Sequence, residues 1–235
     1  MTTAWLATPG RVPYRSAYDA MHDLAARRAA GEIPDVLMLL EHPPVYTAGR
    51  RTDPAHVLLA EAEIQRAGAE LHPVDRGGSV TFHGPGQLVG YPVIHLGSDP
   101  DVIAYLRRLE NAVIRACADL GVEVGRGDEP TGVWAGHRKV CAIGVRVSRG
   151  VTLHGFALNC TTDLSWYGAI VPCGLADRGV TSLSELAGRR IAVEDALPRV
   201  AHRFEEVFDS LLVPAPREIT ESLTGGVAAG APHLL

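Results

Sequence analysis

The sequence is most informative between residues 75 and 87, which read Asp75-Arg76-Gly77-Gly78-Ser79-Val80-Thr81-Phe82-His83-Gly84-Pro85-Gly86-Gln87. The glycines and the proline are turn signals, and the residues between the two glycine groups are rich in β-branched and aromatic side chains. The stretch therefore predicts a loop, a short strand and a second loop. Glycine leaves the backbone bare, which lets a ligand approach it closely. We expect this stretch to line a binding site, although a hairpin that serves only as a turn would carry the same signals.

Two kinds of nucleotide-binding loop can be excluded for this stretch. Gly84, Gly86 and Gly90 resemble the spacing of a dinucleotide fingerprint, but that motif must open a helix. The residues that follow, 88–94, read Leu-Val-Gly-Tyr-Pro-Val-Ile, which is typical of a strand. The stretch also lacks the Gly-Lys-Ser/Thr ending of a Walker-type phosphate loop.

Length and composition predict one substantial domain. The chain has 235 residues, 46% of them hydrophobic, which suffices for a single large core. We expect a catalytic domain over residues 1–212 and a Pro/Ala/Gly-rich tail over 213–235 that is partly disordered. The longest aliphatic run, residues 36–40, is far shorter than the roughly 20 residues that span a bilayer. The first residues do not resemble a secretory signal, so we expect a cytoplasmic protein.

Charge and cysteine spacing argue against several classes of partner. The net charge is −5 and the arginines are scattered, which does not indicate a nucleic-acid binder. The four cysteines, Cys117, Cys141, Cys160 and Cys173, include no Cys-x-x-Cys pair. This spacing favours reduced thiols over a disulfide framework or a thiolate metal site, so we predict no bound metal.

One residue type is almost absent: Lys139 is the single lysine among 22 Lys and Arg residues. Arginine keeps its proton under all conditions that a protein meets, whereas burial favours the neutral form of a lysine, which can accept a proton. A lone lysine on a strand can also be an accident of composition. Lys139 is nevertheless a candidate for a chemical role.

Hydrophobic periodicity predicts alternating helices and strands. We expect strands at residues 35–40, 71–74, 79–83, 88–96, 132–147 and 151–159, and helices at 16–30, 60–67, 100–120, 182–186 and 194–211. Residues 161–170 read as a loop. This pattern is typical of an α/β (α+β) fold in which a mixed β-sheet is flanked by helices.

The candidate nucleophiles are cysteines, and their surroundings differ. Cys173 lies in the turn Val171-Pro172-Cys173-Gly174, where exposure is expected, so it is the leading candidate. Cys141 is two residues from Lys139, and simple strand alternation puts both on one face. Cys160 is a further alternative, and Cys117 falls on the apolar stripe of a helix. His83 and His154 are candidate bases that no spacing pairs with a cysteine.

Several windows of this sequence resemble the lipoyl(octanoyl) transferase family. They are residues 41–52, Arg-Gly-Gly-x-Val-Thr-Phe-His-Gly-Pro-Gly-Gln at 76–87, 139–144, 155–159 and Pro-Cys-Gly at 172–174. The long glycine-rich string is the most specific of them. The resemblance implies the fold of the biotin/lipoate protein ligase catalytic domain. It also implies transfer of an octanoyl group from acyl carrier protein to a lysine of a lipoyl domain.

The resemblance also implies roles for individual residues. Cys173 would carry the acyl group as a thioester, and Lys139 would be the base. The substrate-binding residues would be Arg76, Gly77, Gly78, Ser79, Val80, Thr81, Phe82, His83, Ala142, Ile143, Gly144, Gly155, Phe156 and Ala157. Ser79 stands where the family often has a larger polar residue, and Cys141 where it often has alanine.

The implied partners are octanoyl-acyl carrier protein as donor, and as acceptors the lipoyl domains of 2-oxoacid dehydrogenase complexes and the glycine cleavage H protein. We expect a monomer that needs no cofactor and binds neither nucleic acid nor membrane. Two other functions stay open. An ATP-dependent lipoate or biotin protein ligase would share the architecture without needing a nucleophilic cysteine, and a non-catalytic lipoyl-domain binding module would bind without turnover.

Overall fold

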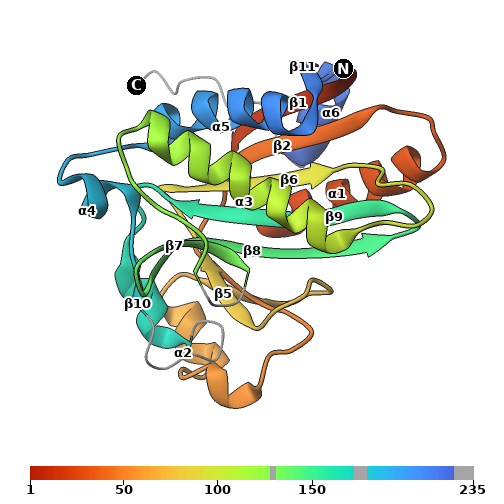
Figure 1. Cartoon of the computed structure of the whole chain (residues 1–235). Helices are drawn as coiled ribbons and strands as arrows, with labels where there is room; N and C mark the ends of the chain where they lie inside the picture. Colours follow the sequence, from red (N-terminus) through yellow and green to blue (C-terminus); the bar gives the residue numbers. More distant parts are fainter. Residues whose placement is uncertain (128–130, 172–178, 225–235) are drawn as a thin grey trace, which may run out of the picture.

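The structure is a computed structural model that describes residues 1–127, 131–171 and 179–224. Its centre is a mixed sheet with strand order β10-β8-β9-β6-β2-β1-β11, and β7 pairs with β8 (Figure 1). The pairs β1/β2, β1/β11 and β8/β10 are parallel, whereas β2/β6, β6/β9, β7/β8 and β8/β9 are antiparallel. The predicted mixed sheet with flanking helices is confirmed.

The strands of this sheet are β1 (Thr2–Arg11), β2 (Asp35–Glu41), β6 (Gln87–Val93), β7 (Gly132–Ala135), β8 (Arg138–Ser148), β9 (Val151–Asn159), β10 (Gly179–Val180) and β11 (Ser210–Pro214). Every residue of β6 and β9 is buried, because helices cover both faces of the sheet. Such central strands read as continuous apolar runs, which is why the sequence predicts β2 and β9 well.

Two layers of helices enclose the sheet. On one face α3 (Val102–Asp119) and α5 (Val193–Phe208) lie side by side, with the short α4 (Leu183–Ala187) nearby (Figure 1). Their core cluster includes Leu109, Val113, Val200 and Phe204. On the opposite face α1 (Tyr14–Ala29) and α6 (Arg217–Leu223) pack with Met21, Leu24, Ile219 and Leu223. Within the described ranges, no helix is long and apolar enough to cross a bilayer.

A small second sheet, ordered β4-β3-β5, carries the glycine-rich stretch. It consists of β3 (Val45–Ala48), β4 (Glu70–Pro73) and β5 (Val80–His83), with α2 (Glu61–Arg66) and the 3₁₀ helices η1 (Pro54–His56) and η2 (Leu164–Ala169) around it. Phe82 stacks on Trp166 in its core, with ring centroids 5.3 Å apart. The loop between β4 and β5 reaches the main sheet, where the Gly77 N–H donates to the Val145 carbonyl of β8 at 3.0 Å.

The ends of the chain differ from the sequence prediction. The sequence did not predict β1, because Pro9 and Gly10 interrupt its pattern. The strand passes them through an irregularity between Ala7 and Gly10, where Gly10 has φ +79°. The prediction ended the domain at residue 212, whereas β11 crosses that boundary and α6 buries Ile219 and Leu223. The prediction rested on the average composition of the tail, which does not reveal two apolar side chains at helical spacing. The rest of the predicted tail, 225–235, lies outside the described residues.

The close pairing of β6 and β9 gives a stability prediction. A Cβ on Gly155 would lie 2.2 Å from the Gly90 carbonyl oxygen and 2.6 Å from Pro92 Cδ, both on β6. Because these atoms belong to the backbone and a proline ring, they cannot rotate away, so Gly155→Ala should lower the free energy of unfolding by about 1–3 kcal/mol. Urea denaturation would measure it. Gly168→Ala is the matched control, because nothing lies within 4 Å of its Cβ position. Equal stability of the two variants would contradict the prediction.

Candidate active site

A cavity of about 730 Å³ lies where the glycine-rich loop meets β8 and β9. Its volume is within the range of small-molecule sites. Fourteen of the sixteen sequence-predicted site residues line it: Arg76, Gly77, Gly78, Ser79, Val80, Thr81, His83, Lys139, Ala142, Ile143, Gly144, Gly155, Phe156 and Ala157. Among the predicted residues that the structure describes, Phe82 does not line it, because its ring is in the core of the small sheet. Cys173 lies outside the described residues.

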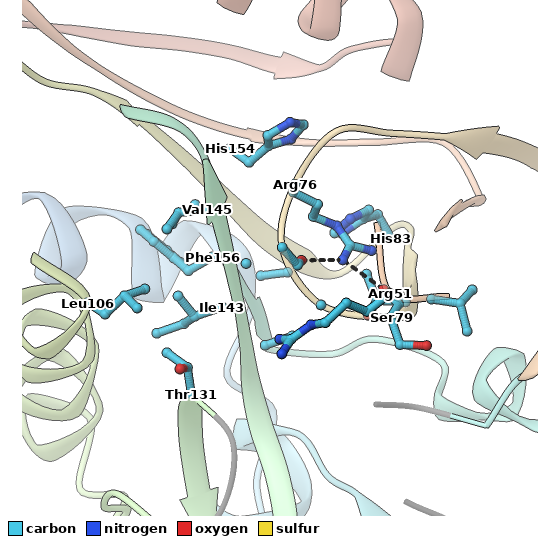
Figure 2. Close-up of a pocket in the computed structure, with 18 of the residues that line it drawn as sticks. Arg51, Arg76, Ser79, His83, Leu106, Thr131, Ile143, Val145, His154 and Phe156 are labelled. Carbon is cyan, nitrogen blue, oxygen red and sulfur yellow. Dashed lines mark hydrogen bonds between the residues drawn. The ribbon is translucent and has the colours of Figure 1, made fainter. Parts of the chain in front are cut away.

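The cavity lining differs in polarity on the two sides of β8. Figure 2 shows Leu106, Ile143, Val145 and Phe156 on one side of the β8 ribbon, and Arg76, Ser79 and His83 on the other. The first group is apolar and belongs to the face covered by α3. The second group is polar and offers a guanidinium, a hydroxyl and an imidazole. The site thus combines an apolar region with a polar one, as a ligand with a hydrocarbon part and a reactive polar group requires.

Arg76 shapes the loop with its guanidinium group. Nη1 donates to the carbonyls of Gly77 (3.0 Å) and Ser79 (2.7 Å) (Figure 2). Nη2 donates to the carbonyl and hydroxyl of Thr47 (2.6 and 2.8 Å). The residue is buried, and Gly49 is needed beside it, since a Cβ there would lie 2.7 Å from Nη1. These contacts fix the loop on β3. The planar, permanently charged fork of arginine suits this multiple carbonyl contact, which lysine could not replace.

The backbone amides near the loop differ in availability. Gly77, Gly78 and Gly144 have no side chain, so their backbone N–H groups are candidates to hold an oxyanion. The Gly77 N–H is already bonded to the Val145 carbonyl. A Cβ on Gly144 would lie 3.0 Å from the Gly77 carbonyl oxygen, so the loop and β8 are in close contact at this point. The Gly77 amide is therefore part of the wall rather than a donor to substrate.

Lys139 and Cys141 do not share a face, which corrects the sequence prediction. The register of β7 on β8 pairs Val133 with Cys141 and Trp134 with Lys139, so Val140 is an extra residue that forms a bulge. Val140 and Cys141 both pack in the α3/α5 core, whereas Lys139 lines the cavity. Such a bulge re-aims a side chain. Lys139 is 6% exposed, and its Nζ lies 4.6 Å from the centre of the Trp134 ring.

The described cysteines are unreactive by this geometry. Cys117, Cys141 and Cys160 are buried free thiols. Burial raises the pKa of Cys141 well above its usual value, and it also raises the pKa of Cys117 to about 12. Nucleophilic cysteines need the opposite environment. The Cys141 thiol is therefore not available to react in the cavity.

A buried polar network lies beneath the cavity. The Nδ1–H of His83 donates to Gln87 Oε1 (2.8 Å), and its Nε2 faces the Thr47 hydroxyl at 3.4 Å. His42 is bonded to the Val12 carbonyl (2.7 Å) and the Tyr91 hydroxyl (2.8 Å). Burial, reinforced by His42, lowers the pKa of His83 to about 3. A base this weak takes up little proton near neutral pH.

His154, the other candidate base, also lines the cavity, and its imidazole is bonded to Asp75. Its Nε2 donates to Asp75 Oδ1 at 2.6 Å, and burial, followed by the Arg76 charge, lowers its pKa to about 3. His22, Asp75 and His154 together have metal-ligand spacing, with ligand atoms within 4.8 Å of one another. However, the Arg146 guanidinium already binds Asp75 and places a positive charge on the carboxylate. We therefore assign no metal to this cluster.

The described residues on either side of 172–178 contact the cavity lining. The Val171 N–H donates to the carbonyl of His56 at 2.8 Å, and His56 lines the cavity. On the other side, Gly179 and Val180 pair with Arg138 and Lys139. The described residues on both sides of 172–178 therefore lie next to residues that line the cavity.

Sequence reasoning gave no site role to several residues that line the cavity: Tyr14, Arg51, His56, Tyr91, Val102, Leu106, Thr131 and Val145. These residues come from separate elements whose meeting point no local pattern reveals. Asp75 was missed as well, although it opens the quoted stretch. A carboxylate next to a glycine-rich loop was the one signal that could have drawn attention to it.

Comparison with known proteins agrees with this geometry. Residues 13–205 match the family described as the lipoyl protein ligase A/B catalytic domain. The octanoyltransferase of Mycobacterium leprae is 48% identical over 229 residues, which cover 91% of this chain and 93% of that protein.

Two solved structures show the same fold. A structure of the bi-partite lipoate protein ligase of Thermoplasma acidophilum has a TM-score of 0.73 at 18% identity and covers 97% of this chain and 92% of that one. A biotin protein ligase from Aquifex aeolicus has a TM-score of 0.52 at 12% identity, covering 89% of this chain and 71% of that one. The resemblance inferred from the sequence is thus confirmed. The chain has the lipoyl protein ligase A/B catalytic domain and is an acyltransferase that belongs to the octanoyltransferase family.

Proposed function

We propose that this enzyme moves an octanoyl group from acyl carrier protein to a specific lysine of lipoyl domains through a thioester on Cys173. This would be the first step of endogenous protein lipoylation. The acceptors would be lipoyl domains of 2-oxoacid dehydrogenase complexes and the glycine cleavage H protein. The enzyme would act as a monomer without a cofactor. Its close relatives named octanoyltransferase support the reaction class.

The position of Lys139 is the observation that carries the proposal. The chain's single lysine is nearly buried, and the β8 bulge directs it into the cavity. The residues that flank the segment containing Cys173 contact the lining at His56 and at Lys139 itself. This arrangement is what a base acting on a Cys173 thiol would require.

In the first step Cys173 takes the acyl group. Its thiol proton passes to the Lys139 amine as the sulfur attacks the thioester carbonyl of the donor. The bond between the carbonyl carbon and the carrier sulfur then breaks, and the carrier thiolate takes the proton back from Lys139. One thioester is exchanged for another, so the step is nearly balanced in energy and needs no ATP.

In the second step the acceptor lysine attacks the acyl-enzyme. A carbon–nitrogen bond forms, the bond to Cys173 Sγ breaks, and Lys139 carries the surplus proton of the amine to the departing thiolate. Formation of an amide from a thioester drives the reaction forward. His83 and His154 are poor alternatives as the base, because their pKa values of about 3 make them weak proton acceptors.

The experiment is intact-protein mass spectrometry after mixing with octanoyl-loaded acyl carrier protein. We expect wild type and Cys141→Ser to gain one octanoyl group that hydroxylamine removes, and Cys173→Ser to gain none. Cys141→Ser is the matched control, because that thiol is buried on the other face of β8.

Two outcomes would contradict the proposal. An adduct on Cys173→Ser would move the nucleophile elsewhere. If no protein gained an adduct and transfer appeared only with ATP and free acid, the enzyme would be a ligase.

A further inference from the structure

His154 has an unusual backbone conformation. It lies within β9 opposite Val145 of β8, yet its φ is +59°, in the left-handed region that residues other than glycine rarely adopt. Directly opposed residues of an antiparallel pair normally point to the same face. Val145 packs toward the α3/α5 cluster, but the His154 ring lies 6.0 Å from that of Tyr18 on α1, on the other face. The left-handed backbone therefore turns the imidazole across the sheet.

The reoriented imidazole meets the carboxylate of Asp75. His154 is 2% exposed, and its Nε2–H donates to Asp75 Oδ1 at 2.6 Å, while Arg146 of β8 binds Asp75 Oδ2. Burial and the charges of Arg76, His22 and Arg146 keep the pKa of His154 low, so the ring is neutral and its N–H is a donor. Unfavourable backbone conformations persist where the surroundings fix them, and such places cluster at functional sites.

Asp75 directly precedes the part of the loop that forms the cavity wall. Two neighbouring strands hold it, because Arg146 comes from β8 and His154 from β9. The next attachment is the bond from the Gly77 N–H to the Val145 carbonyl. The Gly77 carbonyl oxygen lies so near β8 that a Cβ on Gly144 would be 3.0 Å from it. The position of the Gly77–Gly78 wall on β8 therefore depends on two attachments, the one at Asp75 and the bond from the Gly77 N–H.

We infer that Asp75 and His154 are a pair of positioning residues that hold the Gly77–Gly78 wall in place on β8, and so determine the acyl chain length that the cavity accepts. The inference rests on the proposed function. Neither residue contacts the reacting atoms in this scheme. The pair acts through the loop, and the strain at His154 is retained because it brings the imidazole to the carboxylate.

The test uses single-turnover acyl-enzyme formation with butanoyl, octanoyl and dodecanoyl carrier protein. Asp75→Asn keeps the size of the side chain but removes its charge. His154→Asn suits the left-handed backbone and is too short to reach Asp75. For both variants we expect the second-order rate constant of acyl-enzyme formation with the octanoyl donor to fall about 10²-fold, since small misplacement of a positioning group has effects of this size. The preference for octanoyl over the other two donors should also flatten.

Controls separate positioning from general damage. Asp23→Asn makes the same chemical change at an exposed carboxylate of α1 and should leave the chain-length profile unchanged. The double variant should be no worse than either single one if the two residues act as a pair. Should Asp75→Asn fail to fold, Arg146→Gln removes the outer partner of the same carboxylate and should flatten the profile less.

The outcomes distinguish this inference from the proposed function. Wild type that forms no acyl-enzyme with any donor would overturn the proposed function. Active wild type with an unchanged chain-length profile in Asp75→Asn and His154→Asn would overturn the inference alone. Additive losses in the double variant would also overturn the pairing.

Discussion

Replacing Lys139 with arginine should abolish octanoyl transfer while the protein still folds. Arginine holds its proton permanently, so it cannot accept another and cannot serve as the base. Loss of a general base lowers rates by roughly 10²–10⁴-fold. The fold should survive, because arginine can also stack on the Trp134 ring that lies 4.6 Å from Lys139 Nζ. The measurement is the rate of octanoyl transfer from loaded acyl carrier protein to a lipoyl domain.

The adjacent residue offers a matched control for this variant. Arg138→Lys exchanges the same two residue types one position away, at an exposed site on β8. It should transfer at the wild-type rate. Melting temperatures of both variants would show whether each is folded. A Lys139→Arg protein that transfers at the wild-type rate would contradict the base assignment, and so would equal losses in both variants.

Mild acid should destabilise the protein strongly. Burial lowers the pKa of His42 to about 4, of His83 to about 3 and of His154 to about 3, against 6.5 for an ordinary histidine. At pH values between about 4 and 6.5, these histidines are largely protonated in the unfolded chain but remain neutral in the folded protein. Stability is therefore fully present above about pH 6.5 and falls as the pH drops toward 4. At pH 5.5 each histidine costs about 1.4 kcal/mol relative to pH 7.5, or about 4 kcal/mol for all three.

Urea denaturation at pH 7.5 and 5.5 would measure this loss. His42→Gln should reduce the difference between the two pH values by about a third, because one of the three titrating groups is gone. His202→Gln is the matched control: its side chain is 60% exposed on α5, so it should leave the difference unchanged. Equal stability at both pH values would show that these histidines are not held neutral.

Local sequence patterns predicted the centre of the fold and the glycine-rich part of the cavity lining, whereas the other predicted lining residues followed from the family resemblance. Continuous apolar runs marked β2 and β9, which are covered on both faces. The glycine-rich string marked the loop that lines the cavity, because its bare backbone is needed where β8 approaches. What could not be predicted depends on pairing between distant segments. β1 is held by β2 and β11 in spite of Pro9 and Gly10.

The alternation of side chains along a strand did not predict the local geometry of the site. A one-residue bulge at Val140 puts Lys139 and Cys141 on different faces, and no sequence signal marks such a bulge. The left-handed backbone at His154 moves its side chain in the same way. Alternation predicts the face of a strand residue only where the strand is regular.

The burial of the only lysine has a practical consequence for an enzyme whose target is an amine. Lys139 is 6% exposed, so the surface of the protein offers no lysine side chain to an activated acyl group. The enzyme cannot become an accidental acceptor for a neighbouring copy of itself through a surface lysine. For the same reason, an amine-directed reagent will find only two primary amines in the chain, the α-amino group and Lys139. The modification rate of Lys139 can then be followed directly in the unaltered protein.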